Sequence, residues 1–224
     1  MRLLRHKSLI ITLLVVSLSS CFQDKPRILI IGDSISIGYT PFVKENIANK
    51  ADVIHNPGNA QHTGTGLDKI EEWIGSGKWD IIQFNWGLWD LCYRHPDSKV
   101  QGKRDKVNGK ITYSVDDYKY NLDSIVSILE EKTDAKLIFV TTTYVPEDEA
   151  GRYTDEAIKY NDAAKMVMKK HGVIVNDIYE QSIQIHKKFG KGSDDVHYTN
   201  EGYEKLCELV TDFLETEIRL MNIK

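Results

Sequence analysis

Apolar residues after position 25 occur in five short, continuous runs, and amphipathic patterns separate them. The runs lie at 27–31, 52–54, 80–84, 136–143 and 173–175. Continuous runs, as opposed to alternating ones, are typical of strands covered on both faces. The clearest helix pattern begins at Ser114, in capping-box spacing to Asp117, and others cover about 154–170 and 203–218. This alternation predicts a parallel sheet of about five strands in a three-layer α/β/α domain, with its active site beyond the carboxyl ends of the strands.

The first twenty residues have the pattern of an export signal. Three basic residues (Arg2, Arg5, Lys7) precede an apolar run at 9–18, about half the length that a membrane-spanning helix needs. Leu18-Ser19-Ser20-Cys21 resembles the bacterial lipobox, which implies cleavage before Cys21 and lipid attachment to its sulfur. An ordinary secretory signal is the alternative. We therefore expect a signal peptide at 1–20, a tether at 21–26 and one domain at 27–220, exported and anchored to a membrane through Cys21.

Charge and cysteine content narrow the function classes. The net charge is −4, and −7 once the three basic residues of the first twenty are set aside, so we expect no nucleic-acid partner. Beyond Cys21 the chain has Cys92 and Cys207, which could pair in an exported compartment or remain two buried thiols. The sequence has no Cys-x-x-Cys pair and no histidine with ligand-like partners, so we expect no metal site.

Two polar motifs lie where an α/β domain presents its reactive groups. Gly32-Asp33-Ser34 directly follows the first predicted strand, and Asp194-Asp195-Val196-His197 precedes the last predicted helix. A serine hydroxyl is a good nucleophile only when a base takes its proton, and a histidine base needs a carboxylate to fix its tautomer. Each motif alone is also an ordinary polar turn. The chain has no Gly-x-Ser-x-Gly elbow, which disfavours the common α/β-hydrolase layout.

The order of the two motifs resembles the SGNH/GDSL hydrolase family over nearly the whole chain after the signal. The resemblance implies a flavodoxin-like sandwich with Ser34 as nucleophile and His197 as general base and then acid. It assigns the orienting carboxylate to Asp194 and not to Asp195, because one turn of chain in D-x-x-H would bring Asp194 back to the ring. Such enzymes cleave esters through an acyl-enzyme, without metal or cofactor.

The donors of the oxyanion hole are less clear from the sequence. The family's third block is G-x-N-D, but this chain reads Gly87-Leu88-Trp89-Asp90 and lacks the asparagine. Either the indole N–H of Trp89 or the side chain of Asn85 could replace the lost donor. In the second block, 56–64, the pattern indicates the backbone N–H of Gln61, with Gly58 and Gly64 as the better glycines.

The substrate is the last question that the sequence addresses. We expect a small acyl group, such as acetyl, on a carbohydrate or glycan. Lipid-ester or thioester hydrolysis, and a glycan-binding domain with weakened catalysis, are the alternatives. Between Arg94 and Lys110 the chain carries six basic residues and two acidic ones, directly after the third block. We expect this basic segment to overhang the cleft, where it either attracts an anionic substrate or is merely a solvated insertion.

Overall fold

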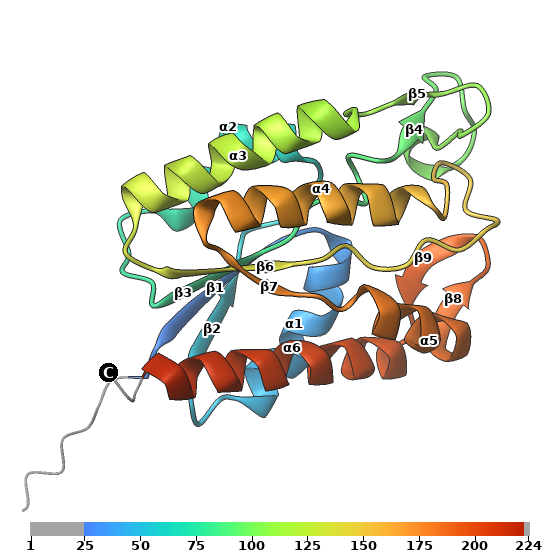
Figure 1. The fold of residues 1–224 in the computed structure, drawn as a ribbon. Coiled ribbons are helices and arrows are strands. Elements are labelled where there is room, and N and C mark those ends of the chain that lie inside the picture. The colour runs from blue at the N-terminus through green and yellow to red at the C-terminus, as the bar shows by residue number, and fades with distance from the viewer. Residues whose placement is uncertain (1–24, 222–224) are drawn as a thin grey trace, which may run out of the picture.

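The computed structural model describes residues 25–221, and it has the predicted three-layer α/β/α architecture (Figure 1). The predicted signal peptide, Cys21 and most of the tether lie outside the described residues. Five parallel strands form the sheet in the order β2-β1-β3-β6-β7. They are β1 (Arg27–Ile31), β2 (Asp52–His55), β3 (Ile81–Phe84), β6 (Lys136–Val140) and β7 (Ile174–Asn176). Each predicted apolar run therefore overlaps one strand of the sheet.

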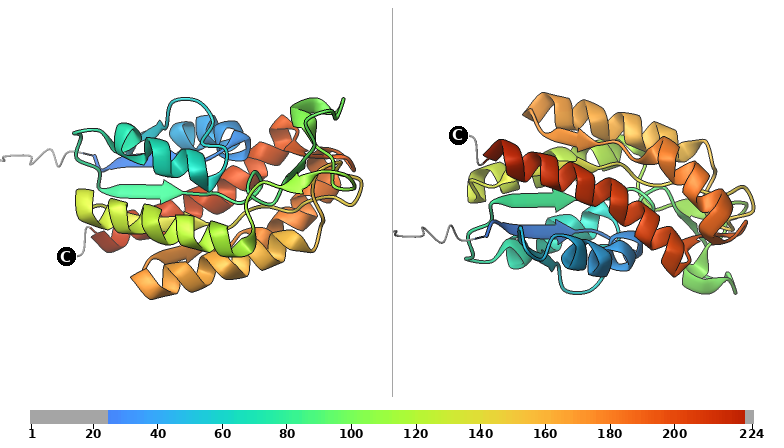
Figure 2. Two further views of the ribbon diagram at one scale, coloured as in Figure 1. Left: turned by 90° about the horizontal axis from the view of Figure 1, so that it is seen from above. Right: turned by 90° about the horizontal axis from the view of Figure 1, so that it is seen from below.

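Helices cover both faces of the sheet (Figure 2). One layer holds α1 (Ser34–Asn46), α5 (Tyr179–Phe189) and α6 (Asn200–Met221), and the other holds α2 (Thr63–Ile74), α3 (Val115–Lys132) and α4 (Glu156–His171). The chain moves outward from β1 to β2 and then returns across β1 to β3, so right-handed crossovers place α1 and α2 on opposite faces. The loops after β1 and β3 diverge at this reversal, and the crevice between them is where such sheets bind ligands.

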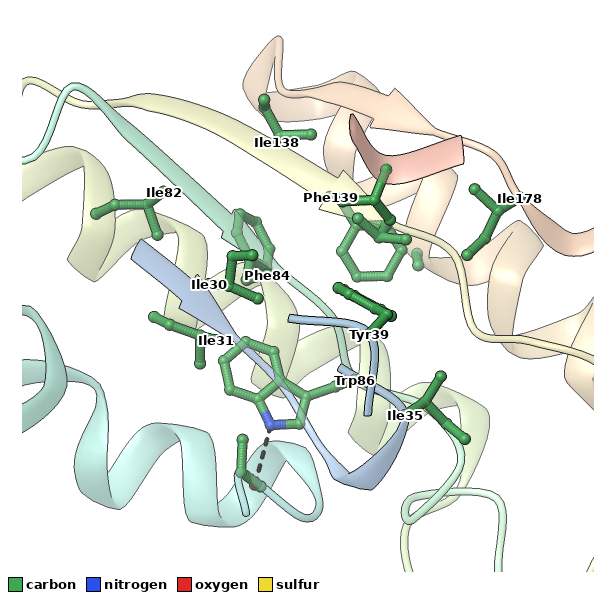
Figure 3. Close-up of a cluster of buried hydrophobic side chains, with 14 of the residues drawn as sticks. Ile30, Ile31, Ile35, Tyr39, Ile82, Phe84, Trp86, Ile138, Phe139 and Ile178 are labelled. Atoms are coloured by element: carbon green, nitrogen blue, oxygen red, sulfur yellow. Dashed lines mark hydrogen bonds between the residues drawn. The ribbon is translucent and has the colours of Figure 1, made fainter. Parts of the chain in front are cut away.

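The core explains why the strands read as continuous apolar runs. All four residues of β3 are buried, and the ring of Phe84 packs edge-on against Phe139 with centroids 5.6 Å apart (Figure 3). Trp86, just beyond β3, is fully buried, and its indole N–H donates to the carbonyl of Ala60 over 3.2 Å. This bond ties the segment after β3 to the loop after β2.

Close packing of α1 against α6 brings the two chemical motifs together. Gly38 of α1 lies so near α6 that a Cβ there would collide with the ring of Tyr203. Ser34 begins α1, and His197 lies three residues before α6. The helix contact therefore fixes the distance between the serine and histidine motifs.

Three features were not predicted. Two antiparallel hairpins, β4 (Tyr93–Arg94) with β5 (Lys110–Ile111) and β8 (Gly190–Gly192) with β9 (Asp195–Tyr198), lie at the carboxyl end of the sheet. Helix α5 is the third. The sequence places His197 just before the last predicted helix and assigns it to no strand, and in the structure it belongs to β9.

Two further observations concern the state of the cysteines and the length of the helices. Cys92 and Cys207 are both buried and free, as the alternative of two unpaired thiols predicts. Within residues 25–221, every helix is too short or too polar to pass through a bilayer.

Candidate active site

Ser34 and His197 meet at the carboxyl end of β1. Ser34 is the first residue of α1, and His197 projects from β9. The Nε2 atom of His197 lies 2.9 Å from Ser34 Oγ, and its Nδ1 atom lies 2.5 Å from Asp195 Oδ1. All three side chains are half-buried. A hydroxyl, an imidazole and a carboxylate are thus aligned so that a proton can pass from the serine to the histidine.

The expectation that Asp194 orients His197 is wrong in this structure. Residues two apart in a strand point to the same face, whereas neighbouring residues point to opposite faces. Since β9 begins at Asp195, its carboxylate lies on the same side as the His197 ring, and Asp194 is exposed outside the strand. The prediction assumed one turn of chain, in which the carboxylate three residues before His197 would reach the ring. In the extended backbone of β9, the carboxylate two residues before His197 does so instead.

The carboxylate of Asp195 is ionised when it faces the imidazole. Partial burial raises its pKa, but hydrogen bonds from the His197 backbone N–H, at 3.0 Å, and from the ring outweigh this effect. The pKa of Asp195 therefore falls below its ordinary value. An ionised carboxylate at Nδ1 keeps that nitrogen protonated and leaves Nε2 free to accept the serine proton.

Asp33 shapes the turn that presents Ser34. Its Oδ1 atom accepts the Ile35 N–H over 2.9 Å and caps the amino terminus of α1. The side chain is 1% exposed, and this burial raises its pKa. The cap places Ser34 in the first helical turn, where backbone N–H groups have no acceptor within the helix. The Ser34 N–H is thus a candidate donor for a developing oxyanion, and sequence reasoning missed it.

A cleft of about 280 Å³ opens beside Ser34. Its walls come from the loops after β1, β2 and β3, from β9, and from the predicted basic segment, through Arg94, Gln101, Gly102 and Arg104. The backbone of this segment is anchored, because Tyr93 N–H donates to Gly151 and Lys106 N–H donates to Ala150, each over 2.7 Å. The segment therefore lines the cleft as an ordered wall, as expected from its position after the third block.

Only one of the four predicted oxyanion donors lines this cleft. Trp89 does so, together with Ser34. Asn85 is buried and donates to the Val140 carbonyl over 2.7 Å, while Gly58 lies on an exposed loop. The backbone N–H of Gln61 donates to Asn59 Oδ1 over 2.8 Å. Gln61, Gly58 and Asn85 are therefore not placed to serve Ser34 directly.

Asn59 is a second candidate donor that sequence reasoning missed. It lines the cleft with Ser34, and its side-chain oxygen accepts the Gln61 N–H. Because a backbone N–H can only donate, the oxygen of the amide must face Gln61, which leaves the NH₂ group for the cleft. A side-chain oxygen of asparagine that accepts the N–H two residues later forms an Asx turn, for which asparagine is a recognisable sequence signal. Gln61 itself has a left-handed φ of +51°.

Asp90 joins the second and third blocks beneath the cleft. Its Oδ1 atom accepts from both the N–H and the hydroxyl of Thr63, at 2.9 Å and 2.5 Å. Burial raises the pKa of Asp90 to about 7. Thr63 begins α2, so this contact holds the loop that carries Asn59 against the loop that carries Trp89.

No cluster of metal ligands accompanies these residues. Among residues 25–221, no three histidine, cysteine, aspartate or glutamate side chains are grouped so that they could hold a metal ion.

Known proteins share this fold and sequence pattern. Residues 30–205 match the model of the GDSL-like lipase/acylhydrolase family. A lipase/acylhydrolase from Enterococcus faecalis superimposes with a TM-score of 0.68 at 20% identity, covering 86% of this chain and 96% of its own. The acetyl xylan esterase AlAXEase gives 0.65 at 15% identity, covering 82% and 97%. Axe2, an acetylxylan esterase from Geobacillus stearothermophilus, gives 0.62 at 16% identity, covering 83% and 92%. No curated protein matches the chain.

The solved structures share the fold, and the family match spans the serine motif, the third block and the histidine motif. The chain therefore belongs to the GDSL-like lipase/acylhydrolase family and is an ester hydrolase of the SGNH/GDSL type.

Proposed function

We propose that this protein is a serine esterase that removes small acyl groups, acetyl above all, from carbohydrates. The observation that carries the proposal is the alignment of Ser34, His197 and Asp195 at the mouth of a small cleft, with contacts of 2.9 Å and 2.5 Å. A cleft of about 280 Å³ lies at the lower end of the range for ligand sites, which suits a short acyl group.

In the proposed reaction, Ser34 Oγ attacks the ester carbonyl carbon while its proton moves to His197 Nε2. The tetrahedral intermediate collapses, the bond from carbon to the alcohol oxygen breaks, and His197 returns the proton to the leaving alcohol. Water then attacks the acyl-enzyme, again giving its proton to His197, and Ser34 recovers the proton as the carboxylic acid leaves. Asp195 stabilises the imidazolium that forms twice in each cycle. The backbone N–H of Ser34, the Asn59 amide and the Trp89 indole are the proposed oxyanion donors.

Similar structures support the acetyl assignment and sharpen one question about the carboxylate. Two of the similar folds are acetylxylan esterases. The catalytic mutants of Axe2 replace a serine, an aspartate and a histidine, and that aspartate lies three positions before the histidine. Asp194 has this spacing here, yet Asp195 contacts the ring. Variants of both aspartates are needed to assign the role.

Hydrolysis of 4-nitrophenyl acetate, butyrate and octanoate tests the acyl preference. We expect kcat/KM to be highest for acetate and to fall with chain length, because three arginines line the cleft beside Ser34 and a longer alkyl chain would lie against their charges. The Ser34→Ala variant measures background hydrolysis. Activity that rises toward octanoate would point to lipid esters, and a folded protein that hydrolyses none of the three would point to a binding domain.

We also propose that Cys21 carries a lipid that anchors the exported enzyme to a membrane. The support is the sequence pattern alone: a basic start, a short apolar run and Ser-Ser before the cysteine. Expression with the native signal should place the protein in the membrane fraction, and Cys21→Ser should abolish the mass added by the lipid. An intact mass with unmodified Cys21 would refute the proposal.

A further inference from the structure

Three arginines line the cleft, and one of them lacks an acidic partner among the described residues. Arg104 and Arg152 both contact Oε1 of Glu149, at 2.5 Å and 2.8 Å, and Glu149 is fully buried. No such ion pair involves Arg94 within residues 25–221. The two carboxylates that line the cleft are engaged elsewhere, since Asp195 accepts from His197 and Asp33 caps α1. The guanidinium of Arg94 thus carries an uncompensated positive charge at the cleft wall.

Arg94 is held in a defined position. Its guanidinium carbon lies 4.6 Å from the centroid of the Trp89 ring, and its Nη1 group donates to the Gly102 carbonyl. The Nε and Nη2 groups form the remaining edge of the guanidinium, and no hydrogen bond from that edge to a described residue is present. Two parallel N–H groups on one edge match the two oxygens of a carboxylate.

The surroundings of Arg94 favour an anion. Partial burial lowers the pKa of its guanidinium, and repulsion from Arg152 and Arg104 adds to this effect. A half-buried charge without a partner costs free energy, which a bound anion would recover. Of the six basic residues in the segment between Arg94 and Lys110, only Arg94 and Arg104 line the cleft, and Arg104 is already paired with Glu149.

We propose that Arg94 binds a carboxylate on the substrate close to the scissile ester, so that the preferred substrates are acyl esters of uronate-bearing glycans. This inference rests on the proposed esterase function and names its substrate class. The Nε and Nη2 groups of the planar guanidinium can donate to both oxygens of one carboxylate. Trp89 holds the guanidinium in place, so little rotamer freedom is lost when the substrate binds.

Binding of trigalacturonate, with xylotriose as the neutral counterpart, tests this inference without requiring hydrolysis. With the purified full chain, calorimetry should show that trigalacturonate binds more tightly than xylotriose. Arg94→Gln should weaken trigalacturonate binding about tenfold or more, the usual size of a charge-assisted contact. Lys99→Gln is the matched control, because Lys99 is an exposed cation of the same segment outside the cleft. Equal loss in both variants, or none in Arg94→Gln, would overturn the inference.

Two further measurements complete the test. The first distinguishes a bidentate contact from attraction by charge alone, and the second distinguishes the anion site from the proposed esterase function. Arg94→Lys keeps the positive charge but lacks the two parallel N–H groups of the guanidinium. Wild-type affinity for trigalacturonate in this variant would therefore refute the bidentate contact. Hydrolysis of acetylated polygalacturonate and acetylated xylan then gives a ratio of kcat/KM values, which Arg94→Gln should lower about tenfold. Specific trigalacturonate binding in a protein that cleaves neither polymer would refute the esterase proposal and leave the anion site standing.

Discussion

Replacing Ser34 or His197 with alanine is expected to reduce kcat by roughly 10⁴-fold to 10⁶-fold while the domain stays folded. The two side chains act as one unit, because His197 Nε2, 2.9 Å from Ser34 Oγ, has to take the proton as the serine attacks. The double variant should therefore lose little more than either single variant. Stoichiometric labelling of the wild type by a fluorophosphonate, and its loss in Ser34→Ala, would identify the nucleophile directly.

The neighbouring aspartates provide a matched pair for the third member of the triad. Asp195→Asn should lower kcat by about 10⁴-fold, because an amide in place of the carboxylate no longer fixes the required tautomer of His197. Asp194→Asn changes the same residue type one position away, on an exposed side chain, and should have little effect. Both variants should unfold at nearly the wild-type temperature. The opposite order of effects would show that Asp194 replaces Asp195 at the ring during catalysis.

Loss of one oxyanion donor is expected to lower kcat by roughly 10²-fold to 10³-fold with a modest change in KM. Trp89→Phe removes the indole N–H and keeps most of the ring that stacks on Arg94. Asn59→Asp keeps the oxygen that accepts the Gln61 N–H but loses the NH₂ group, and Asn59→Ala loses both. A similar fall in the two Asn59 variants would exclude the added negative charge as the cause.

Gln61→Gly is the control for this experiment. Glycine retains the backbone N–H and readily adopts the φ of +51° observed at Gln61, so activity should be preserved. If activity survives in all the Asn59 and Trp89 variants, the backbone N–H of Ser34 is the principal donor.

The sequence correctly predicted the placement of residues that depends on position along a strand or helix. Ser34 follows a continuous apolar run, and Ser114 caps its helix as predicted, with Asp117 N–H donating to the serine hydroxyl over 3.2 Å. Continuous apolar patterns reveal strands because both faces of each strand are buried. These signals are local, so the fold class and the main strands could be derived from them.

The errors arose where tertiary contacts decide the local backbone. Asp194 was preferred to Asp195 because the spacing was interpreted as a turn, whereas pairing with β8 extends residues 195–198. Asn59 was overlooked because its role depends on a side-chain contact to Gln61 and on the position of α2, which Asp90 anchors from a distant loop. No periodicity in a single sequence encodes such contacts between loops.

The direction of β1 determines which way an anchored enzyme would face. The described chain enters β1 at Arg27, at the amino end of the sheet, whereas Ser34 and the cleft lie at the opposite end (Figure 1). The five residues of β1 separate these ends by about 16 Å. If Cys21 holds a lipid, the anchor joins the domain at the end of the sheet opposite the cleft. Such an arrangement favours polymers that approach from solution over esters in the enzyme's own bilayer.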